Sequence, residues 1–332
     1  MLAKKGCVVK NKIRALFNSE TFIGYCFILP NFVGFLLFIS LPVIASFLLS
    51  FVSWDIFNPP QFVGLKNFLD LFGFHMRPGA AFGSIFDYLF VWRYVVPNDF
   101  EFWYYLYNTT FFMLGIPLGM IGSLLMAIIM NRPLRGITFF RTIYFLPSIS
   151  SIVAIALLWR WIYNPDYGLL NTLLGYMGIQ GPAWLNHPVW ARFSLIIMGL
   201  WSGVGGYNML LYLAALQGIP QHLYEASEID GANAWQKFVH ITVPMLSPTT
   251  FFIFIMSVIG GFQGGFQSAY LMTRGGPGGA TTTIEYYIYN NAFVWFYMGK
   301  ASALAWFLFV IIFMVTLFNW KFGGKKVQYQ YM

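Results

Sequence analysis

The sequence predicts an all-α protein that crosses a membrane six times, with both chain termini on the cytoplasmic side. Its 332 residues are 58% hydrophobic and only 9% charged, a composition far outside that of soluble globular domains. A membrane-spanning helix needs about 20 mostly apolar residues. Six segments meet that requirement, with approximate limits 22–52, 109–130, 143–163, 193–217, 248–272 and 301–320.

The charged residues around these segments predict the orientation of the chain, because cytoplasmic loops carry an excess of Lys and Arg. With the N-terminus inside, twelve of the nineteen basic residues fall inside, but only four of the eleven acidic ones. The inside cations are Lys4, Lys5, Lys10, Lys12, Arg14, Arg132, Arg135, Arg141, Lys237, Lys321, Lys325 and Lys326. Membrane topology therefore explains the formal net charge of +8, and nucleic-acid binding is not predicted.

Three parts of the chain follow from this topology. Residues 1–21 form a basic cytoplasmic tail, residues 22–322 the six-span domain, and residues 323–332 a second cytoplasmic tail. The first span is too long for the apolar core of a signal peptide, so we expect it to be retained. Cys7 lies in the tail and Cys26 in the first span, which excludes a secreted disulfide framework.

A long stretch, residues 53–107, separates the first two spans and is expected to fold as an extracytoplasmic cap. Within it, residues 80–96 are apolar, but Asp87 and Arg93 would each cost about 2.5–3.5 kcal/mol at a bilayer centre. This segment is therefore placed outside the membrane. The second span is expected to begin at Asn108, a good helix N-cap residue.

The next two spans carry recognisable helix-packing and interface signals. Gly115 and Gly119 form a small-xxx-small pattern that lets helices approach closely, although glycines facing lipid are the alternative. The third span ends at Trp159-Arg160-Trp161 and Tyr163, which are expected to anchor it at the outer surface.

The fourth and fifth spans are unusually polar and rich in glycine. Amides cost free energy in hydrocarbon unless they bond to other helices or line a wet cavity. A pathway between these spans is one interpretation, and a tight helix seam with satisfied amides is the other. The residues concerned are Ser202, Gly203, Gly205, Gly206, Tyr207 and Asn208 in the fourth span, and Ser257, Gly260, Gly261, Gln263, Gly264, Gly265, Gln267 and Tyr270 in the fifth.

The loop between these spans, residues 218–247, is the one inside connection with a net negative charge, and it is longer than a turn requires. Asp230-Gly231 is expected to break it into two short amphipathic helices, the second over residues 232–240, and Pro244 and Pro248 to close the unit. Such a plug suits a groove in another protein, whereas a solvated surface loop is the alternative. The apolar faces comprise Leu223, Ala226 and Ile229, and then Trp235, Phe238 and Val239.

This loop resembles the EAA loop of ABC importer permeases, E-A-A-x2-D-G-A-x5-F-x2-I-x-L-P-x-L-x-P. The matching positions are Glu225-Ala226-Ser227, Asp230-Gly231-Ala232, Phe238, Ile241, Pro244, Leu246 and Pro248, with Ser227 in place of the second alanine and Val243 in place of leucine. Residues 62–68, 108–109, 131–136, 140–142, 161–165, 168–171 and 273–277 look like the sugar branch of these permeases, the maltose-type first subunit. The cap at 53–107 is less typical of the branch.

The resemblance implies the type I ABC importer permease fold and a multi-pass location in a bacterial plasma (inner) membrane. It implies a permease subunit of an ATP-driven carbohydrate importer. The implied partners are a second permease, two ATP-binding subunits that hold ATP and Mg²⁺, an extracytoplasmic solute-binding protein, membrane lipid and the carbohydrate. A solute such as a polyol or glycerol phosphate, a passive channel and a structural membrane subunit remain alternatives.

The sequence contains no phosphate-binding loop, since Gly299-Lys300 lacks the upstream glycine and the following hydroxyl, so the chain itself is not expected to be an enzyme. Its histidines lack metal-ligand spacing, so no metal site is predicted. The residues expected to couple to the ATPase are Tyr224, Glu225, Ala226, Asp230, Gly231, Ala232 and Phe238. Hydroxyl and amide groups can pair with sugar hydroxyls, so the expected solute contacts are Tyr207, Asn208, Ser257, Gln263 and Gln267.

Overall fold

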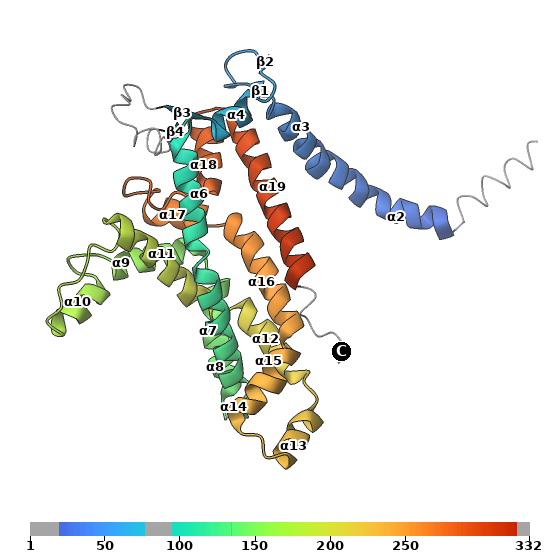
Figure 1. Ribbon diagram of the computed structural model, residues 1–332, viewed down its shortest axis with the longest axis vertical. Helices are drawn as coiled ribbons and strands as arrows, with labels where there is room; N and C mark the ends of the chain where they lie inside the picture. Colours follow the sequence, from blue (N-terminus) through green and yellow to red (C-terminus); the bar gives the residue numbers. More distant parts are fainter. Residues whose placement is uncertain (1–19, 77–94, 134, 324–332) are drawn as a thin grey trace, which may run out of the picture.

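The computed structural model describes residues 20–76, 95–133 and 135–323, which form a helical bundle (Figure 1). Most of the two predicted tails, and the part of the cap that holds Asp87 and Arg93, lie outside these residues, whereas residues 20–21 and 323 belong to helices. Within the described chain, three helices are long and apolar enough to cross a bilayer, over Ile23–Leu49, Phe100–Met130 and Met298–Lys321. Three bent helix pairs pass the same test together, so the spans number three to six by length and composition.

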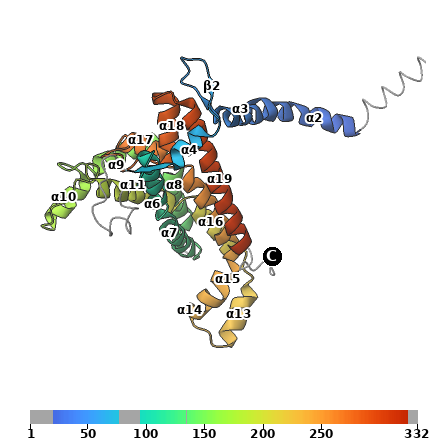
Figure 2. The ribbon, with the colours of Figure 1, turned by 45° about the horizontal axis from the view of Figure 1, so that its top comes forward.

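The first span is one continuous apolar helix that leads away from the bundle in both ribbon views (Figures 1 and 2). It consists of α2 (Glu20–Phe35), the π-helical turn η1 (Leu36–Ser40) and α3 (Leu41–Leu49). None of its most apolar 18-residue window is buried inside the chain.

The described part of the 53–107 segment contains two small antiparallel sheets and a short helix. Strand β1 (Val52–Ser53) pairs with β2 (Gln61–Phe62), and β3 (Phe74–Met76) pairs with β4 (Val95–Pro97). Helix α4 (Lys66–Phe72) lies between the two sheets in sequence and contributes the buried Leu71 to the main core.

The second span begins earlier than predicted, because α6 (Phe100–Phe112) starts eight residues before Asn108 and leads into α7 (Gly115–Met130). The N-cap is Asp99, whose carboxylate accepts a hydrogen bond from the Phe102 N–H at 2.9 Å. The prediction for Asn108 was therefore wrong. The aromatic residues before it continue the helix, and its own side chain is fully buried.

The third to fifth spans are broken. Helices α8 (Ile137–Ile149) and α9 (Ile152–Ile162) meet at 95°, and α11 (Pro188–Gly203) and α12 (Tyr207–Gln217) meet at 43°. Helix α10 (Leu169–Tyr176) lies between the two pairs in sequence. The sequence predicted two uninterrupted spans here.

The predicted fifth span, 248–272, is also interrupted. Helix α16 (Ser247–Phe262) ends before the break at 263–265, and α17 (Phe266–Met272) follows. Gly265 has φ +94°, a conformation that glycine adopts far more readily than other residues. The glycines around Gln263 thus end a helix that hydropathy alone would continue.

The predicted anchor at the end of the third span is partly wrong. Trp159 is buried, and its ring lies 5.0 Å from that of Tyr163 and 5.8 Å from that of Trp201. Trp161 is exposed, in keeping with an interfacial position. Trp159 therefore belongs to a core cluster between α9 and α11.

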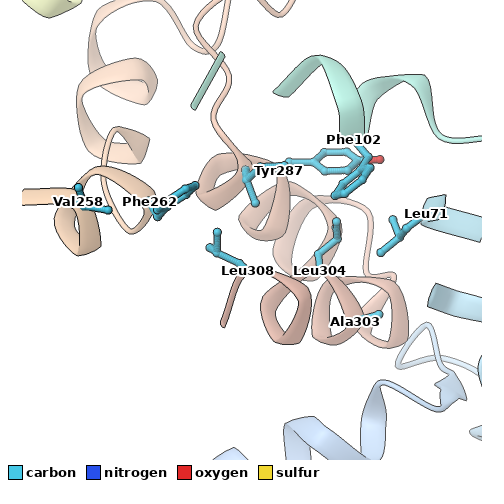
Figure 3. Close-up of a cluster of buried hydrophobic side chains, with 9 residues drawn as sticks. Leu71, Phe102, Val258, Phe262, Tyr287, Ala303, Leu304 and Leu308 are labelled. Atoms are coloured by element: carbon cyan, nitrogen blue, oxygen red, sulfur yellow. The ribbon is translucent and has the colours of Figure 1, made fainter. Parts of the chain in front are cut away.

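The main core joins the last helices to the second span. Helices α18 (Ile284–Tyr289) and α19 (Met298–Gly323) are separated by the π-helical turn η4 (Asn290–Val294). Figure 3 shows their side chains in one cluster with those of α4, α6 and α16. The cluster consists of Leu71, Phe102, Val258, Phe262, Ile284, Tyr287, Ala303, Leu304 and Leu308.

Two polar networks reinforce this core. The Asn108 amide donates to the carbonyl oxygens of Gly279 and Thr282 at 2.8 and 3.0 Å, and its oxygen accepts two bonds from the Arg192 guanidinium. Separately, Lys300 forms an ion pair with Asp99 at 2.8 Å and also donates to the Tyr287 hydroxyl. These networks fix α6, α11 and α19 to the segment that precedes and includes α18.

The Asn108 network predicts a stability defect. Replacing Asn108 with alanine leaves the carbonyls of Gly279 and Thr282 and the Arg192 guanidinium each short of a partner, and such a group costs about 1–3 kcal/mol where it is fully buried, as at Thr282. We therefore expect Asn108→Ala to lower the midpoint of thermal unfolding in detergent by several degrees. Thr110→Ala is the matched control, because the Thr110 hydroxyl is exposed and, among the described residues, bonds to Leu106 in its own helix. Equal midpoints for the two variants would contradict this role for Asn108.

Candidate functional site

A cavity of about 290 Å³ lies between α7, α11, α12 and α16. Its apolar wall is built on a row of glycines, and its polar groups are the side chains of Ser123, Asn208, Ser257 and Ser268. The glycines that line it are Gly115, Gly119, Gly199, Gly203 and Gly265.

The predicted small-xxx-small pattern accounts for part of this wall. A Cβ atom on Gly115 would meet Ile196 at 3.4 Å, and one on Gly119 would meet Leu200 at 3.5 Å. Both glycines therefore face α11 and allow a close approach of two helices. The alternative, in which they face lipid, is wrong.

Ser123 is a polar residue of this cavity that the sequence did not reveal. It is fully buried, and its hydroxyl has no hydrogen-bond partner among the described residues. A buried hydroxyl normally has a hydrogen-bond partner. The Ser123 hydroxyl on the cavity wall would therefore favour a polar group of a bound molecule at this place.

A second cavity, of about 400 Å³, lies where the third and fourth spans break. It is lined by Ser148, Ser150 and Ser202 together with Tyr207 and Asn208. Asn208 and Gly203 also line the first cavity, so the two cavities are neighbours that share part of their lining. Irregular backbone at membrane depth is tolerated where it lines a cavity, which agrees with this arrangement.

Three of the five predicted contact residues gather at these cavities. Asn208 and Ser257 line the first cavity, and Tyr207 lines the second. Gln263 and Gln267 are exposed and line neither of them, since they lie at and just after the break in the fifth span. Solute contact by any of the five stays a prediction.

Glu285 lies beside the same break. Its carboxylate accepts a hydrogen bond from the Phe266 N–H at 3.1 Å, directly after Gly265. Burial raises the pKa of Glu285 above its usual value. Only the tertiary fold brings this acid to the start of α17, so no local sequence pattern indicated it.

The loop at 218–247, which follows α12, reverses direction at the predicted place, Asp230-Gly231. Helix α13 (Gln221–Ile229) ends in a Schellman motif, in which the Ala232 N–H donates to Ser227 at 2.9 Å and the Gly231 N–H to Glu228 at 3.0 Å. Gly231 has φ +77°. The predicted break at Asp230-Gly231 is therefore confirmed.

The second half of the loop differs from the prediction. Its helix begins with α14 (Ala234–Lys237), after an Asn233–Gln236 capping box, and continues through η3 (Phe238–Thr242) and α15 (Val243–Met245). It then bends by 62° into α16. Pro244 and Pro248 lie within the first turns of α15 and α16, where proline is tolerated, and so do not end the unit.

Side-chain bonds hold the two halves of the loop together. The Tyr224 hydroxyl lies 2.9 Å from that of Thr242, and Lys237 forms an ion pair with Glu228 at 2.6 Å. Tyr224 thus has a contact inside this chain in addition to any it makes with a partner.

The surface of the loop that faces away from the rest of the chain is exposed to solvent and partly apolar. Glu225, Ala226 and Asp230 are exposed, whereas Ala232 and Phe238 are half-buried. Ile229 and Trp235 are 88% and 70% exposed, so the predicted apolar faces turn largely to solvent. An exposed tryptophan and isoleucine on a rigid unit form a surface suited to a protein partner.

Comparison with known proteins gives consistent matches. A profile of the family described as "Binding-protein-dependent transport system inner membrane component" matches residues 115–321. The chain is 36% identical over 330 residues to "Probable ABC transporter permease protein YesP" of Bacillus subtilis (strain 168), covering 98% of this chain and 97% of the relative. It is 34% identical over 306 residues to "Trehalose/maltose transport system permease protein MalF" of Thermococcus litoralis, covering 92% and 94%.

A solved structure shares the fold. It is a bacterial ABC transporter involved in the import of the acidic polysaccharide alginate, and the matched chain superposes with a TM-score of 0.76. The match covers 96% of this chain and 98% of the other, at 24% identity.

The Schellman motif predicts how substitutions at Gly231 behave. A Cβ at this position meets open space, so backbone strain alone should decide the outcome. We expect Gly231→Val, which resists positive φ by about 1–2 kcal/mol, to speed hydrogen exchange at Ala232 by roughly tenfold. Gly231→Asn should have a smaller effect, because asparagine tolerates this conformation. Equal exchange rates in both variants, measured by mass spectrometry, would contradict this explanation.

Proposed function

Since the chain belongs to the family of binding-protein-dependent transport system inner membrane components, we propose that it is the permease subunit of an ATP-driven carbohydrate importer. The observation that carries the proposal is the connection between the two cavities and the loop at 218–247. Helix α12 precedes that loop in the chain and α16 follows it. Both helices line the first cavity, α12 with Asn208 and α16 with Ser257.

The loop has the stiffness that a coupling element needs. Its Schellman motif, its capping box and the Tyr224–Thr242 contact hold its two helices as one unit. A partner that moves this unit would also move α12 and α16, and rocking of those helices would change access to the cavities. In this proposal Glu225, Asp230 and Trp235 meet the ATPase subunit.

The lining of the cavities supports a neutral polyhydroxylated solute. The described side chains that line the two cavities include serines, Tyr207 and Asn208, but no charged group. Hydroxyl and amide groups can exchange hydrogen bonds with sugar hydroxyls without placing a charge in the membrane. A polyol fits the same chemistry, whereas glycerol phosphate would lack a cation here.

The remaining subunits belong to the proposal as well. The chain is a non-catalytic membrane component. We assign ATP and Mg²⁺ to two ATP-binding subunits. A second permease would complete the pathway beside Tyr207, which is 65% exposed, and an extracytoplasmic solute-binding protein would deliver the solute. The coupling loop and both termini would face the cytoplasm of a bacterium.

Reconstitution tests this function. The complete complex in proteoliposomes should accumulate a labelled oligosaccharide only with ATP and the solute-binding protein. ATP-independent flux through this chain alone would show a channel instead. ATPase activity of the isolated chain would contradict the permease assignment.

The cavity residues predict a selective transport defect. Asn208→Ala and Ser257→Ala each remove a group that lines the first cavity, and loss of one hydrogen bond worth about 0.5–1.5 kcal/mol should lower uptake roughly two- to tenfold. Co-purification with the other subunits should not change. Thr110→Ala is the control because its hydroxyl is exposed and bonds within its own helix. Loss of assembly in the cavity variants would instead assign these residues to helix packing.

A further inference from the structure

A third cavity, of about 570 Å³, lies apart from the two already described. It is formed at the end of α9, at the end of α17 and by the loops on either side of α10, and its polar wall holds Arg160, Asn164, Asn186, Thr273 and Arg274. None of the residues that line it lines either of the other two cavities. It is therefore a separate site rather than an extension of the solute cavities.

The two arginines that line this cavity are exposed. Across the described chain, neither guanidinium forms an ion pair or a side-chain hydrogen bond. Arg192 and Arg141, by contrast, bond to Asn108 and to the Met130 carbonyl. Among the described residues, these two guanidinium groups therefore have no acidic partner, and because both line one cavity they offer a recognition site for an anion.

The backbone around Arg274 is fixed in an unusual conformation. Arg274 has φ +51°, in the left-handed region where long side chains are uncommon, and Gly275 follows with φ +83°. Hydrogen bonds hold this turn, since the Thr282 hydroxyl donates to the Gly275 carbonyl and the Thr273 and Thr281 hydroxyls lie 2.6 Å apart. Glycine would adopt this conformation more easily than arginine, so the presence of arginine on this well-fixed turn supports the hypothesis that its side chain has a function.

Hydrogen bonds also hold the loops on either side of α10, which form another part of the cavity lining. The Asn171 amide donates to the carbonyls of Pro165 and Pro182, and its oxygen accepts from the Trp184 indole N–H at 2.7 Å. The Asn164 oxygen accepts from two backbone N–H groups, so its NH₂ group remains available as a donor. The site therefore offers two guanidinium groups and at least one amide donor on preorganised loops.

This donor set suits an oxyanion, and a carboxylate is the oxyanion that a protein surface carries on its own side chains. Guanidinium groups bind carboxylates with paired, charge-assisted hydrogen bonds, and amide donors can complete the contact. The solute cavities expose no charged side chain among the described residues, so an acidic solute captured here would find no cation further along its path. A carboxylate that stays at the surface of the chain is therefore favoured over one that passes through it.

We propose that Arg160 and Arg274 form a docking site for an aspartate or glutamate side chain on the surface of the solute-binding protein. This inference rests on the proposed function, which supplies that partner. Charge complementarity at this site would align the solute-binding protein with the permease and speed their association.

The test uses the complete complex in nanodiscs with its own solute-binding protein. The double variant Arg160→Ala/Arg274→Ala should bind the solute-binding protein at least tenfold more weakly at low salt, and the difference should shrink at 1 M salt because exposed charges are screened. Basal ATPase activity and complex assembly should stay unchanged.

Lys66→Ala, which removes an exposed cation from the cap region outside this cavity, should bind normally. A charge swap sharpens the test, since an acid-to-arginine variant of the solute-binding protein should restore binding to Arg274→Glu.

Two results would overturn the docking site. One is an unchanged affinity of the double variant for the solute-binding protein. The other is normal binding combined with a defect confined to acidic oligosaccharides, which would assign the carboxylate to the solute. Failure of the proposed function looks different, because the unaltered complex itself would then show no stimulation by any solute-binding protein.

Discussion

A bilayer core offers no hydrogen-bond partner to a free peptide group, so every break in a membrane-spanning helix must be covered by protein or must face a wet cavity. This chain breaks its third, fourth and fifth spans, at 150–151, 204–206 and 263–265. Each break contributes lining to one or both of the solute cavities, through Ser150, Gly206 and Gly265. The second break also lies directly against α8, because any side chain on Gly205 would collide with the Tyr144 carbonyl. Meeting this constraint therefore creates the polar spaces that a solute could use.

The same breaks divide the chain into a fixed part and a part able to move. The Asp99–Lys300 ion pair and the Asn108 network join α6 and α19 to α18 and its preceding loop, and the main apolar cluster lies between them. Beyond the breaks, α12 and α16 attach to the stiff loop at 218–247. The C-terminal end of α19 lies beside Phe251 in α16, so the end of the described chain and that loop are on the same side of the bundle. Force applied to the loop would reach the cavity walls along α12 and α16. The polar networks would meanwhile restrain the part of the bundle formed by α6, α18 and α19.

Hydropathy was sufficient to find the apolar segments, because span length and apolar content are local properties of the sequence. It could not locate their ends or bends. Asn108 has the local features of an N-cap, yet its amide is used by residues far along the chain, and Trp159 has the features of an interfacial anchor but is buried. Asn208 and Ser257 could be singled out because polar groups are rare in apolar helices, and both line the first cavity. Ser123 could not, since a serine in such a helix usually bonds to its own backbone. Arg160 and Arg274 line one cavity only because of tertiary folding.

One electrostatic principle accounts for the absence of described charged side chains in the first two cavities and for the two arginines at the third. A cation inside the solute cavities would interact strongly in a medium of low dielectric constant and would hold a solute that needs to leave. Recognition by charge is better placed at the exposed cavity of Arg160 and Arg274, where water and salt keep the interaction reversible. Under the proposed function the loop at 218–247 would have the opposite requirement, because it would have to stay attached while force passes through it. Exposed Trp235 and Ile229 would meet that requirement, since apolar contact is not screened by salt as charge pairs are. Each of the three surfaces thus carries the type of interaction suited to how long its partner must remain bound.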